Sequence, residues 1–260
     1  MIYTSNVYIN FLIMLQKLRD TIYSAGLLLG KIKYNNRNSK VLYYHDVHRD
    51  NTKPETLIST PMSLFSEHIR IIKVQGFEIV DRITEAENQI MLTFDDGYKG
   101  IYKNKDFFFN EGLKPTVFLV SNSIGADTFM EKDEILFLQK EGFRFQSHTH
   151  THPLLNKLNI KELKEEFSTS KNILENLLSK EVDEICFPEG LFNSKATETA
   201  RDCGYKYLYS SIPGSYYETN HFRVIHRSLV QHANHSNFIS ILYGGSCIYK
   251  KRLIKRHFSE

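Results

Sequence analysis

Two adjacent carboxylates, Asp95 and Asp96, follow an apolar run at residues 91–94 and precede Gly97. Neighbouring side chains of a strand point to opposite faces, so both acids can reach one cavity only if the chain bends at the strand end, which Gly97 permits. Two carboxylates side by side raise each other's cost of ionisation unless a cation or a hydrogen-bond donor lies nearby. The pair therefore indicates a polar or metal-binding centre, and an Asp-Asp-Gly turn that caps the next helix is the alternative.

Three histidines, His148, His150 and His152, lie within five residues at the end of another predicted strand. Imidazole is the usual nitrogen ligand for zinc and related divalent ions. His148 and His152 are four positions apart and can converge on one ion if the segment turns after the strand, whereas His150 would suit an extended segment. Two imidazoles and one carboxylate would leave coordination positions open for water and substrate, as catalytic metal sites do. The spare carboxylate could then act as a general base.

A regular framework has to position these residues, and past residue 40 short apolar runs alternate with helical patterns. This alternation is typical of βα units around a mostly parallel sheet in an α/β protein. The predicted strands cover residues 40–45, 90–94, 115–120, 143–147, 184–187, 205–209 and 222–225. The predicted helices cover residues 61–75, 99–111, 131–140, 160–178, 194–203 and 237–243, with N-terminal caps at Thr60-Pro61 and at Asn159 with Glu162. Seven strands suit a barrel, although an open doubly wound sheet shows the same alternation.

The ends of the chain carry patterns of their own, so we expect an N-terminal amphipathic helix in residues 1–35, a catalytic domain in residues 36–230, and a C-terminal helix with a basic tail in residues 231–260. A helical stripe in the first part could lie on a membrane surface, but a stripe that faces the protein is the favoured interpretation. The tail's basic cluster could attract anionic lipid headgroups or a phosphate-bearing substrate, although a solvated helix is the commoner explanation. The stripe is Leu12, Leu15, Leu18 and Ile22, and the cluster is Lys250, Lys251, Arg252, Lys255 and Arg256.

Composition limits the class of protein. A 41% apolar and 24% charged chain is typical of a folded globular protein, and a formal net charge of +3 is too small to indicate a nucleic-acid partner. Cys186, Cys203 and Cys247 form no Cys-x-x-Cys pair, which favours a reducing compartment. The apolar stretch at residues 7–15 lacks a basic leader and is too short to span a bilayer. We therefore expect a cytoplasmic location, with peripheral contact to the inner membrane surface through either terminal helix.

Both motifs together resemble the polysaccharide deacetylase family, the NodB-homology domain of carbohydrate esterase family 4. Thr93-Phe94-Asp95-Asp96-Gly97 is similar to the family's first motif, and His148 to His152 is similar to its second, His-Ser/Thr-x-x-His. Over about residues 40–230, the resemblance implies a single-domain α/β fold, a distorted (β/α)7-type barrel with its site at the C-terminal ends of the strands.

Carried over by position, the resemblance implies that Asp95 is the catalytic base and that Asp96, His148 and His152 hold one divalent metal ion. Zinc is the first choice for this ion, and cobalt, nickel or iron would also suit the ligands.

The family's third motif usually contains an arginine and a Pro-x-Gly turn, and here it reads Cys186-Phe187-Pro188-Glu189-Gly190. The turn is present but the arginine is not, so the sequence leaves open what orients Asp95. Phe187, Pro188 and Gly190 are the candidate substrate-binding residues, with a backbone N–H near Phe187 as a candidate donor to an oxyanion. A simple surface turn is the alternative.

The last family motif supplies a histidine general acid as Leu-x-His near the C terminus, where no such motif occurs here. One branch, resembling the exopolysaccharide deacetylases, carries this histidine on the first strand in a Tyr-His setting, and Tyr44-His45 is similar to it. His45 is therefore predicted as the acid, ahead of His226, His232 and His235. Amide hydrolysis requires such a donor because an amine is too basic to leave unprotonated.

These features predict a metal-dependent hydrolase that removes N-acetyl groups from an amino sugar in a polysaccharide, an oligosaccharide or a lipid-linked precursor of a surface polysaccharide. Among fifteen tyrosines, Tyr98, Tyr205 and Tyr209 are candidate platforms for stacking a sugar. Two alternatives stay open: a carbohydrate-binding protein without turnover, and a deformylase or esterase that acts on a related sugar.

Overall fold

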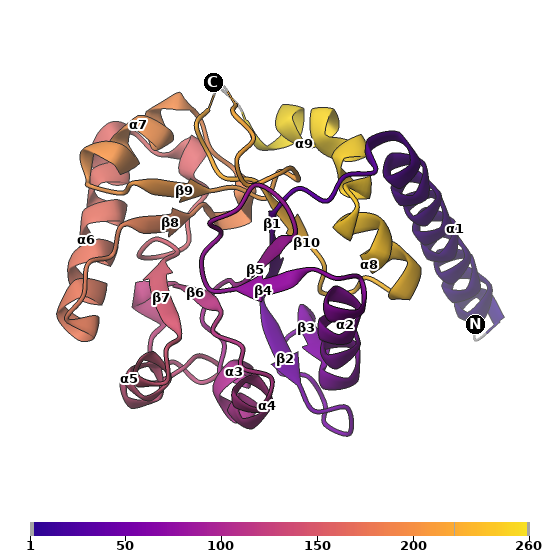
Figure 1. Ribbon diagram of the computed structural model, residues 1–260, viewed down its shortest axis with the longest axis horizontal. Helices are drawn as coiled ribbons and strands as arrows, with labels where there is room; N and C mark the ends of the chain where they lie inside the picture. The colour runs from indigo at the N-terminus through magenta and orange to yellow at the C-terminus, as the bar shows by residue number, and fades with distance from the viewer. Residues whose placement is uncertain (1–2, 221, 259–260) are drawn as a thin grey trace.

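Short parallel strands run through the centre of the molecule and helices surround them (Figure 1). The computed structural model describes residues 3–220 and 222–258, with side chains from Leu12 onward. The barrel strands are β1 (Lys40–Tyr44), β5 (Gln89–Phe94), β6 (Thr116–Leu119), β7 (Arg144–Ser147), β8 (Glu184–Cys186), β9 (Tyr207–Tyr209) and β10 (Arg227–Leu229). Strand β4 (Glu78–Val80) pairs with β5, and β2 (Asp46–His48) pairs with β3 (Ser59–Pro61) as a separate ribbon.

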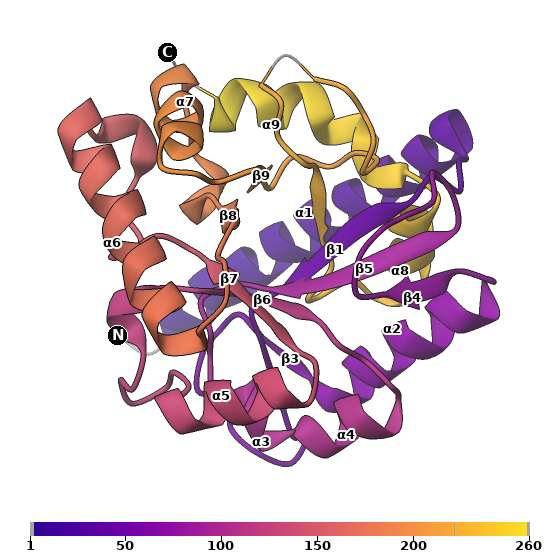
Figure 2. The same ribbon diagram turned by 60° about the vertical axis from the view of Figure 1, so that its left-hand side comes forward.

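The order along the sheet is β10-β1-β5-β6-β7-β8-β9, and each neighbouring pair is parallel. Its two ends approach each other through a bridge between Tyr209 and Ile225, so the sheet is nearly closed. Figure 2 shows the strands splayed around this interior with the helices outside. The predicted distorted (β/α)7 barrel in a single α/β domain is confirmed, and the doubly wound sheet is excluded.

Helices follow most strands and cover the outside of the barrel. They are α1 (Tyr3–Tyr34), α2 (Met62–Val74), α3 (Gly100–Lys103), α4 (Lys105–Asn110), α5 (Lys132–Lys140), α6 (Ile160–Leu178), α7 (Ser194–Asp202), α8 (His235–Leu242) and α9 (Lys250–His257). The predicted capping box is present at the start of α6, where the Asn159 side chain accepts from the backbone N–H of Glu162 and the Glu162 side chain accepts from that of Asn159. The other predicted cap is wrong, because the Thr60 hydroxyl donates to the Gln231 carbonyl and Asp50 accepts from the backbone of Ser63 instead.

Burial explains why the strands read as apolar runs. Every residue of β1, β5 and β6 is buried, since helices cover the outer face and side chains fill the interior. On the outer face, the rings of Tyr44, Phe65, Phe94 and Phe108 pack with centroids 5.0 to 5.8 Å apart. This aromatic cluster joins the first two barrel strands to α2 and α4 and so fixes the strand ends where Asp95 and His45 emerge.

Two predicted elements differ from the structure. The strand expected at residues 222–225 is a loop with an isolated bridge at Ile225, because the Asn220 side chain hydrogen-bonds both backbone groups of Val224 and Arg223 takes a left-handed φ of 54°. The last barrel strand therefore begins five residues later than expected, at Arg227. The helix expected at residues 99–111 is divided at Asn104, whose side-chain amide donates to the Gly100 carbonyl and competes with regular helix geometry.

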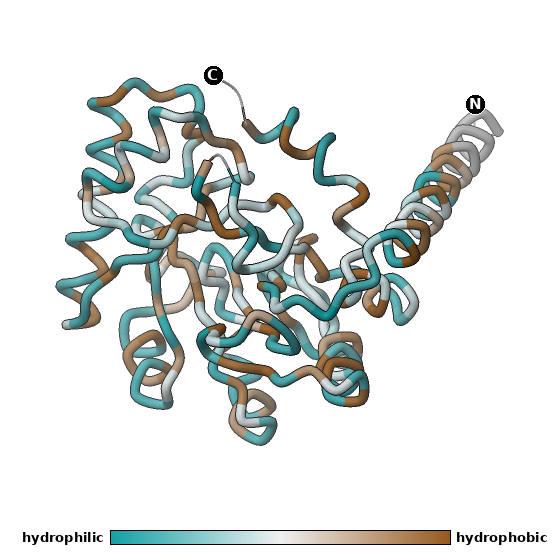
Figure 3. The backbone as a smooth tube through the Cα atoms, turned by 45° about the horizontal axis from the view of Figure 1, so that its top comes forward, coloured by the Kyte–Doolittle hydropathy of each residue, from teal (hydrophilic) through white to brown (hydrophobic). Residues whose placement is uncertain are grey.

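Helix α1 packs on the protein through its second half, in agreement with the favoured interpretation that the helix faces the protein. The contact is not made by the predicted stripe. Leu27 is fully buried, and a Cβ at Gly30 would lie 2.1 Å from the Gly245 carbonyl oxygen, so the backbones touch there. Leu18 and Ile22 of the predicted stripe are 54% and 63% exposed. Figure 3 shows α1 extending away from the rest of the molecule, with apolar segments along it. Within residues 3–220 and 222–258, no helix is long and apolar enough to cross a bilayer.

Candidate metal-dependent active site

The predicted site residues gather at the carboxyl ends of the barrel strands. His45 follows β1, Asp95 and Asp96 follow β5, and His148 and His152 follow β7. Enzymes with this architecture carry their active sites at this end of the barrel. The strand framework thus brings together side chains that lie far apart in the sequence.

Asp96, His148 and His152 form a compact set of metal ligands. The Oδ1 atom of Asp96 lies 3.4 Å from Nε2 of His148 and 3.5 Å from Nε2 of His152. Donor atoms bound to one tetrahedral ion at ordinary zinc distances are roughly 3.3 to 3.5 Å apart, so the residues present fit a divalent cation. The predicted bend after β5 is also present, since Asp96 and Gly97 take positive φ angles of 70° and 88°. His152 is held at a φ of 60°, and such strained backbone is common at functional sites.

The His148 side chain is oriented by its surroundings. Nδ1 of His148 lies 2.8 Å from the Cys186 carbonyl oxygen, which can only accept, so Nδ1 carries the proton and Nε2 is free to bind a metal. Burial lowers the pKa of His148, which keeps the imidazole neutral for this role. His150 points elsewhere and contacts Ser121 at 2.9 Å. Only the two histidines four positions apart converge, as their spacing suggested.

The loop that presents His152 is fastened by Glu166 of α6. Its carboxylate accepts hydrogen bonds from the backbone N–H groups of His150 and Thr151 at 2.9 Å and from the Thr151 hydroxyl at 2.6 Å. The His152 N–H donates to the Thr149 hydroxyl at 3.1 Å. Sequence reasoning did not identify Glu166, because nothing in the α6 pattern distinguishes it from the neighbouring glutamates.

Arg227 is the residue that orients Asp95, which the third motif did not identify. Its guanidinium donates to both carboxylate oxygens of Asp95 at 2.7 Å, with the side chain of Arg227 fully buried and that of Asp95 nearly so. The remaining donors reach the Ser210 carbonyl, the Thr93 hydroxyl and the Cys186 sulfur, so all five N–H groups have partners. Burial alone would raise the pKa of Asp95, but the charge and hydrogen bonds of Arg227 outweigh it and hold that pKa well below its usual range.

A second set of donors, Asp95, His148 and Cys186, also lies close enough to be considered as a metal site. Arg227 already donates to both Asp95 oxygens and to the Cys186 sulfur, which leaves a positive charge where the cation would sit. Burial also raises the pKa of Cys186 well above its usual value, so the thiol stays protonated. The set with Asp96, His148 and His152 is therefore the candidate metal centre.

His45 lines the same cleft as both aspartates. Its Nδ1 lies 2.6 Å from the amide oxygen of Gln231, which only accepts, so Nδ1 carries a proton and Nε2 is the nitrogen that can gain and lose one. The rival histidines are absent from the cleft wall formed by the described residues: His226 is buried elsewhere, and His235 is exposed and paired with Glu67. His232 is exposed close to His45 but also lies outside the cleft.

The cleft has a volume of about 710 Å³, within the range of single-ligand sites. Phe187 and Tyr98 line it as predicted, and Tyr98 stacks on Phe129 with ring centroids 4.7 Å apart. Pro188 and Gly190 lie behind the wall: Gly190 takes a φ of 67°, and a Cβ there would lie 2.7 Å from Ser211. Their predicted contacts with substrate have no support in this geometry.

Two predictions about sugar-stacking platforms are wrong. The predicted oxyanion donor near Phe187 is not the N–H of Phe187 itself, because that group donates to the Tyr209 carbonyl at 3.1 Å. Tyr205 and Tyr209 are 1% and 2% exposed, and their hydroxyls donate to the Phe167 carbonyl and to Glu184. Neither ring can stack against a sugar.

The barrel carries an Asp-His-His cluster that could hold a metal ion, beside a carboxylate held by arginine, and this arrangement suits metal-assisted hydrolysis. The sequence model of the polysaccharide deacetylase family matches residues 82–208, which contain both carboxylates and both histidine ligands. This segment of the chain is therefore similar to the polysaccharide deacetylase family. The Bacillus subtilis protein YxkH, whose name assigns it provisionally to the polysaccharide deacetylases, is 24% identical over 198 residues, which cover 72% of this chain and 69% of that one.

Solved structures show the same fold. The Streptococcus pyogenes deacetylase PplD, in complex with acetate, gives a TM-score of 0.70 at 19% identity, covering 80% of this chain and 99% of that one. A polysaccharide deacetylase from Bacillus cereus gives 0.68 at 22% identity, covering 80% and 69%. A de-N-acetylase from Aggregatibacter actinomycetemcomitans gives 0.68 at 18% identity, covering 78% and 99%.

Proposed function

We propose that this protein is a metal-dependent hydrolase that removes the N-acetyl group of an amino sugar. The observation that carries the proposal is the meeting of Asp96, His148 and His152 around one point, with Asp95 and His45 on the same cleft. A divalent cation bound by these ligands would polarise the acyl carbonyl and make a water molecule more acidic. Among the described residues, three protein ligands meet at this site, a number that suits a catalytic rather than a structural metal.

The roles of the two catalytic residues follow from their hydrogen bonds. The carboxylate of Asp95, fixed by Arg227, accepts the proton of the attacking water on a lone pair that faces the cleft. His45 holds its Nδ1 proton against Gln231 and gives the Nε2 proton to the departing amine. We therefore propose that the chain belongs to the branch whose acid histidine follows the first strand, and the position of His45 in the cleft supports this.

The substrate proposed is an N-acetylated sugar in a polysaccharide, an oligosaccharide or a lipid-linked precursor of a surface polysaccharide, with zinc as the first metal to test. A deformylase or esterase would use the same residues and differ only in the acyl group. A binding protein without turnover is disfavoured, because a buried carboxylate held by arginine beside a set of metal ligands has no use in mere sugar binding.

The proposed activity can be tested directly. The protein loaded with zinc, cobalt, nickel or iron is incubated with N-acetylglucosamine oligomers and with their N-formyl and O-acetyl analogues, and released acid is measured with product masses. We expect metal-dependent acetate release that Asp95→Asn abolishes while the metal content stays the same. Full turnover in Asp95→Asn, or turnover without metal, would refute the proposed mechanism.

Contact with an anionic membrane surface through α1 is proposed as well. The face opposite its packed side carries Leu18, Ile22, Leu29 and Ile32, each 54% to 70% exposed. Between residues 12 and 34 the helix has four basic residues, Lys17, Arg19, Lys31 and Lys33, and one acid, Asp20. An apolar face flanked by basic residues suits a helix lying in the headgroup region of a membrane.

This contact predicts binding to vesicles. We expect the protein to sediment with phosphatidylcholine vesicles that contain phosphatidylglycerol, and Ile22→Glu with Leu29→Glu to reduce the bound fraction several-fold by removing apolar contact. A protein that stays in the supernatant with anionic vesicles would contradict the proposal. The cytoplasmic location remains a prediction that the three unpaired cysteines support.

A further inference from the structure

The two ends of the chain build one wall of the cleft. Tyr23 of α1, together with Tyr249, Arg252, Arg256 and His257 from the C-terminal segment, lines the same cavity as the metal ligands. These residues lie outside the segment that matches the family, residues 82–208. This wall of the cleft is therefore formed by parts of the chain outside the matched segment.

Contacts at both ends of α9 hold the helix in a defined position along the cleft. Before its start, the Tyr249 hydroxyl donates to the Tyr23 carbonyl at 2.9 Å, and their rings stack with centroids 5.3 Å apart. At its end, the His257 carbonyl accepts from the backbone N–H of Phe192 at 2.9 Å, and Phe258 packs on the Phe192 ring. Between these anchors, Arg252 and Arg256 stand one helical turn apart along the cleft.

The wall carries positive charge that the protein itself does not neutralise. Neither Arg252 nor Arg256 forms an ion pair with any residue in the described part of the chain. Like charges four positions apart on a helix repel each other, so the pair is unfavourable without an anion. His257 adjoins them at 7% exposure, and its Nδ1 has no hydrogen-bond partner among residues 3–220 and 222–258.

The remaining charges of the cleft do not cancel this excess. Asp95 is neutralised by Arg227, and Asp96 belongs to the metal-ligand set. Glu189 is the one further carboxylate among the residues that line the cavity, so a single acid stands against the two arginines of the wall. An anionic ligand therefore fits this wall better than a neutral one.

We propose that α9 forms a subsite for a phosphate group, so that the acylated sugar is itself a sugar phosphate; this inference rests on the proposed function. Guanidinium groups match phosphate oxygens with paired hydrogen bonds, and two of them one turn apart can hold one phosphate between them. A cavity of about 710 Å³ holds a single small ligand, so the phosphate and the amide must belong to the same short molecule. The phosphate is a monoester in a soluble sugar phosphate and a diester in a lipid-linked sugar, and both offer negatively charged phosphate oxygens to the two guanidinium groups.

The test compares three probes: an N-acetylglucosamine trimer, N-acetylglucosamine 1-phosphate, and N-acetylglucosamine linked through phosphate to a polyprenyl chain. We expect the wild-type protein to prefer a phosphorylated probe. In Arg252→Gln with Arg256→Gln, kcat/KM for that probe should fall at least about tenfold, the loss expected for one charge-assisted hydrogen bond, while the trimer is unaffected. The ratio between the two phosphorylated probes identifies a soluble or a lipid-linked source.

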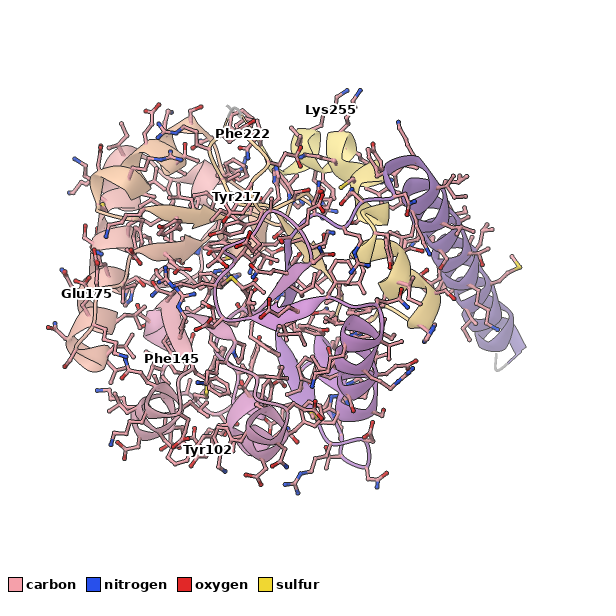
Figure 4. All side chains as sticks on the ribbon, in the orientation of Figure 1. Tyr102, Phe145, Glu175, Tyr217, Phe222 and Lys255 are labelled. Carbon is pink, nitrogen blue, oxygen red and sulfur yellow. The ribbon has the colours of Figure 1, made fainter. Side chains whose placement is uncertain are left out.

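Lys255→Gln is the matched control, because it removes the same charge from α9 outside the cleft. Lys255 is exposed, and Figure 4 shows it on the outer side of the helix, away from the barrel. This variant should behave as wild type with all three probes. An equal loss on phosphorylated and neutral probes, or no loss in the double arginine variant, would overturn the subsite.

Binding separates this inference from the proposed activity. Titration calorimetry with glucose 1-phosphate, which has no amide to cleave, should show binding that Arg252→Gln with Arg256→Gln abolishes. Acetate release from the trimer without such binding would leave the deacetylase proposal in place and overturn the phosphate subsite. Binding that depends on the arginines, without acetate release from any probe, would support the phosphate subsite and overturn the deacetylase proposal.

Discussion

At the scale of single residues, Asp95 shows what spacing in the sequence can and cannot reveal. The paired carboxylates and the histidine triplet are local patterns, and they placed Asp95, Asp96, His148 and His152 in one site. Arg227 lies 132 positions from Asp95, and its partner is visible only after the barrel closes. An arginine inside the run Val224 to Val230 was the available signal, since a charged residue in an apolar run is rarely buried without a partner.

The Asp95–Arg227 pair predicts how stability depends on pH. Because Arg227 holds the pKa of Asp95 below its unfolded value, the pair stabilises the fold at neutral pH, and this contribution is lost as the pH falls through the acidic range. We expect Arg227→Met to lower the free energy of unfolding by about 3 to 5 kcal/mol at neutral pH, because it leaves a buried charge unpaired. Urea unfolding at pH 7 and near pH 4 measures both values, and the deficit should shrink at the lower pH.

Asp95→Asn combined with Arg227→Met serves as the control for this pair. Removing both charges leaves no unpaired ion, so the double variant should be more stable than Arg227→Met alone. A deficit in Arg227→Met that does not change with pH would mean that Asp95 is not the group that Arg227 stabilises.

If His45 is the general acid, the loss of turnover in a His45 variant should depend on how basic the leaving group is. We expect His45→Gln to lower amide turnover by about 10² to 10⁴ while hydrolysis of 4-nitrophenyl acetate changes little, because nitrophenolate departs without a proton. His232→Gln, which alters an exposed histidine outside the cleft, should leave both rates unchanged. Equal losses on both substrates would indicate that His45 orders the site instead of donating a proton.

At the scale of elements, the long buried strands were the most predictable parts of the fold. β1 and β5 are apolar runs buried on both faces, and their expected bounds agree with the structure within one residue. The strand expected at residues 222–225 failed, because the side-chain hydrogen bonds of Asn220 override the strand propensity of Phe222 and Val224. The conformation of the loops that present the metal ligands could not be predicted for the same reason. It depends on side-chain contacts such as those of Glu166.

Glu166 tests whether α6 holds the loop that presents His152, because this residue contacts the loop but is not one of the proposed metal ligands. Glu166→Ala should release the His150 and Thr151 backbone and lower zinc affinity by about 10- to 100-fold, as loss of outer-shell support usually does. Glu165→Ala, on an exposed position of the same helix, is the matched control. Competition with a chelating dye gives the affinities, and unchanged binding in Glu166→Ala would show that the loop holds its shape without α6.

At the scale of the whole molecule, the terminal helices are part of the folded unit. The proposed division into residues 1–35, 36–230 and 231–260 describes the sequence patterns. In the structure, α1 packs through Tyr23 on Tyr249, in the turn just before α9, and both terminal segments complete the cleft. Composition and periodicity could not reveal this, because the exposed stripe of α1 suggested the wrong contact face.

Gly30 tests the attachment of α1. Gly30→Ala places a methyl group against the Gly245 carbonyl, so we expect a loss of about 1 to 3 kcal/mol in the free energy of unfolding and faster release of α1 by protease. Ala25→Ser, on the exposed side of the helix, should change neither. Wild-type stability and protection in Gly30→Ala would mean that α1 does not pack as the structure shows.

The central claim is that one divalent cation binds between the loops that follow β5 and β7, which carry the first two motifs. Anomalous diffraction at the zinc edge, from crystals grown with zinc, tests it most directly. We predict one strong peak within about 2.0 to 2.2 Å of a carboxylate oxygen of Asp96 and of Nε2 of His148 and His152. A peak between Asp95, His148 and Cys186, or no peak in the cleft, would contradict the account.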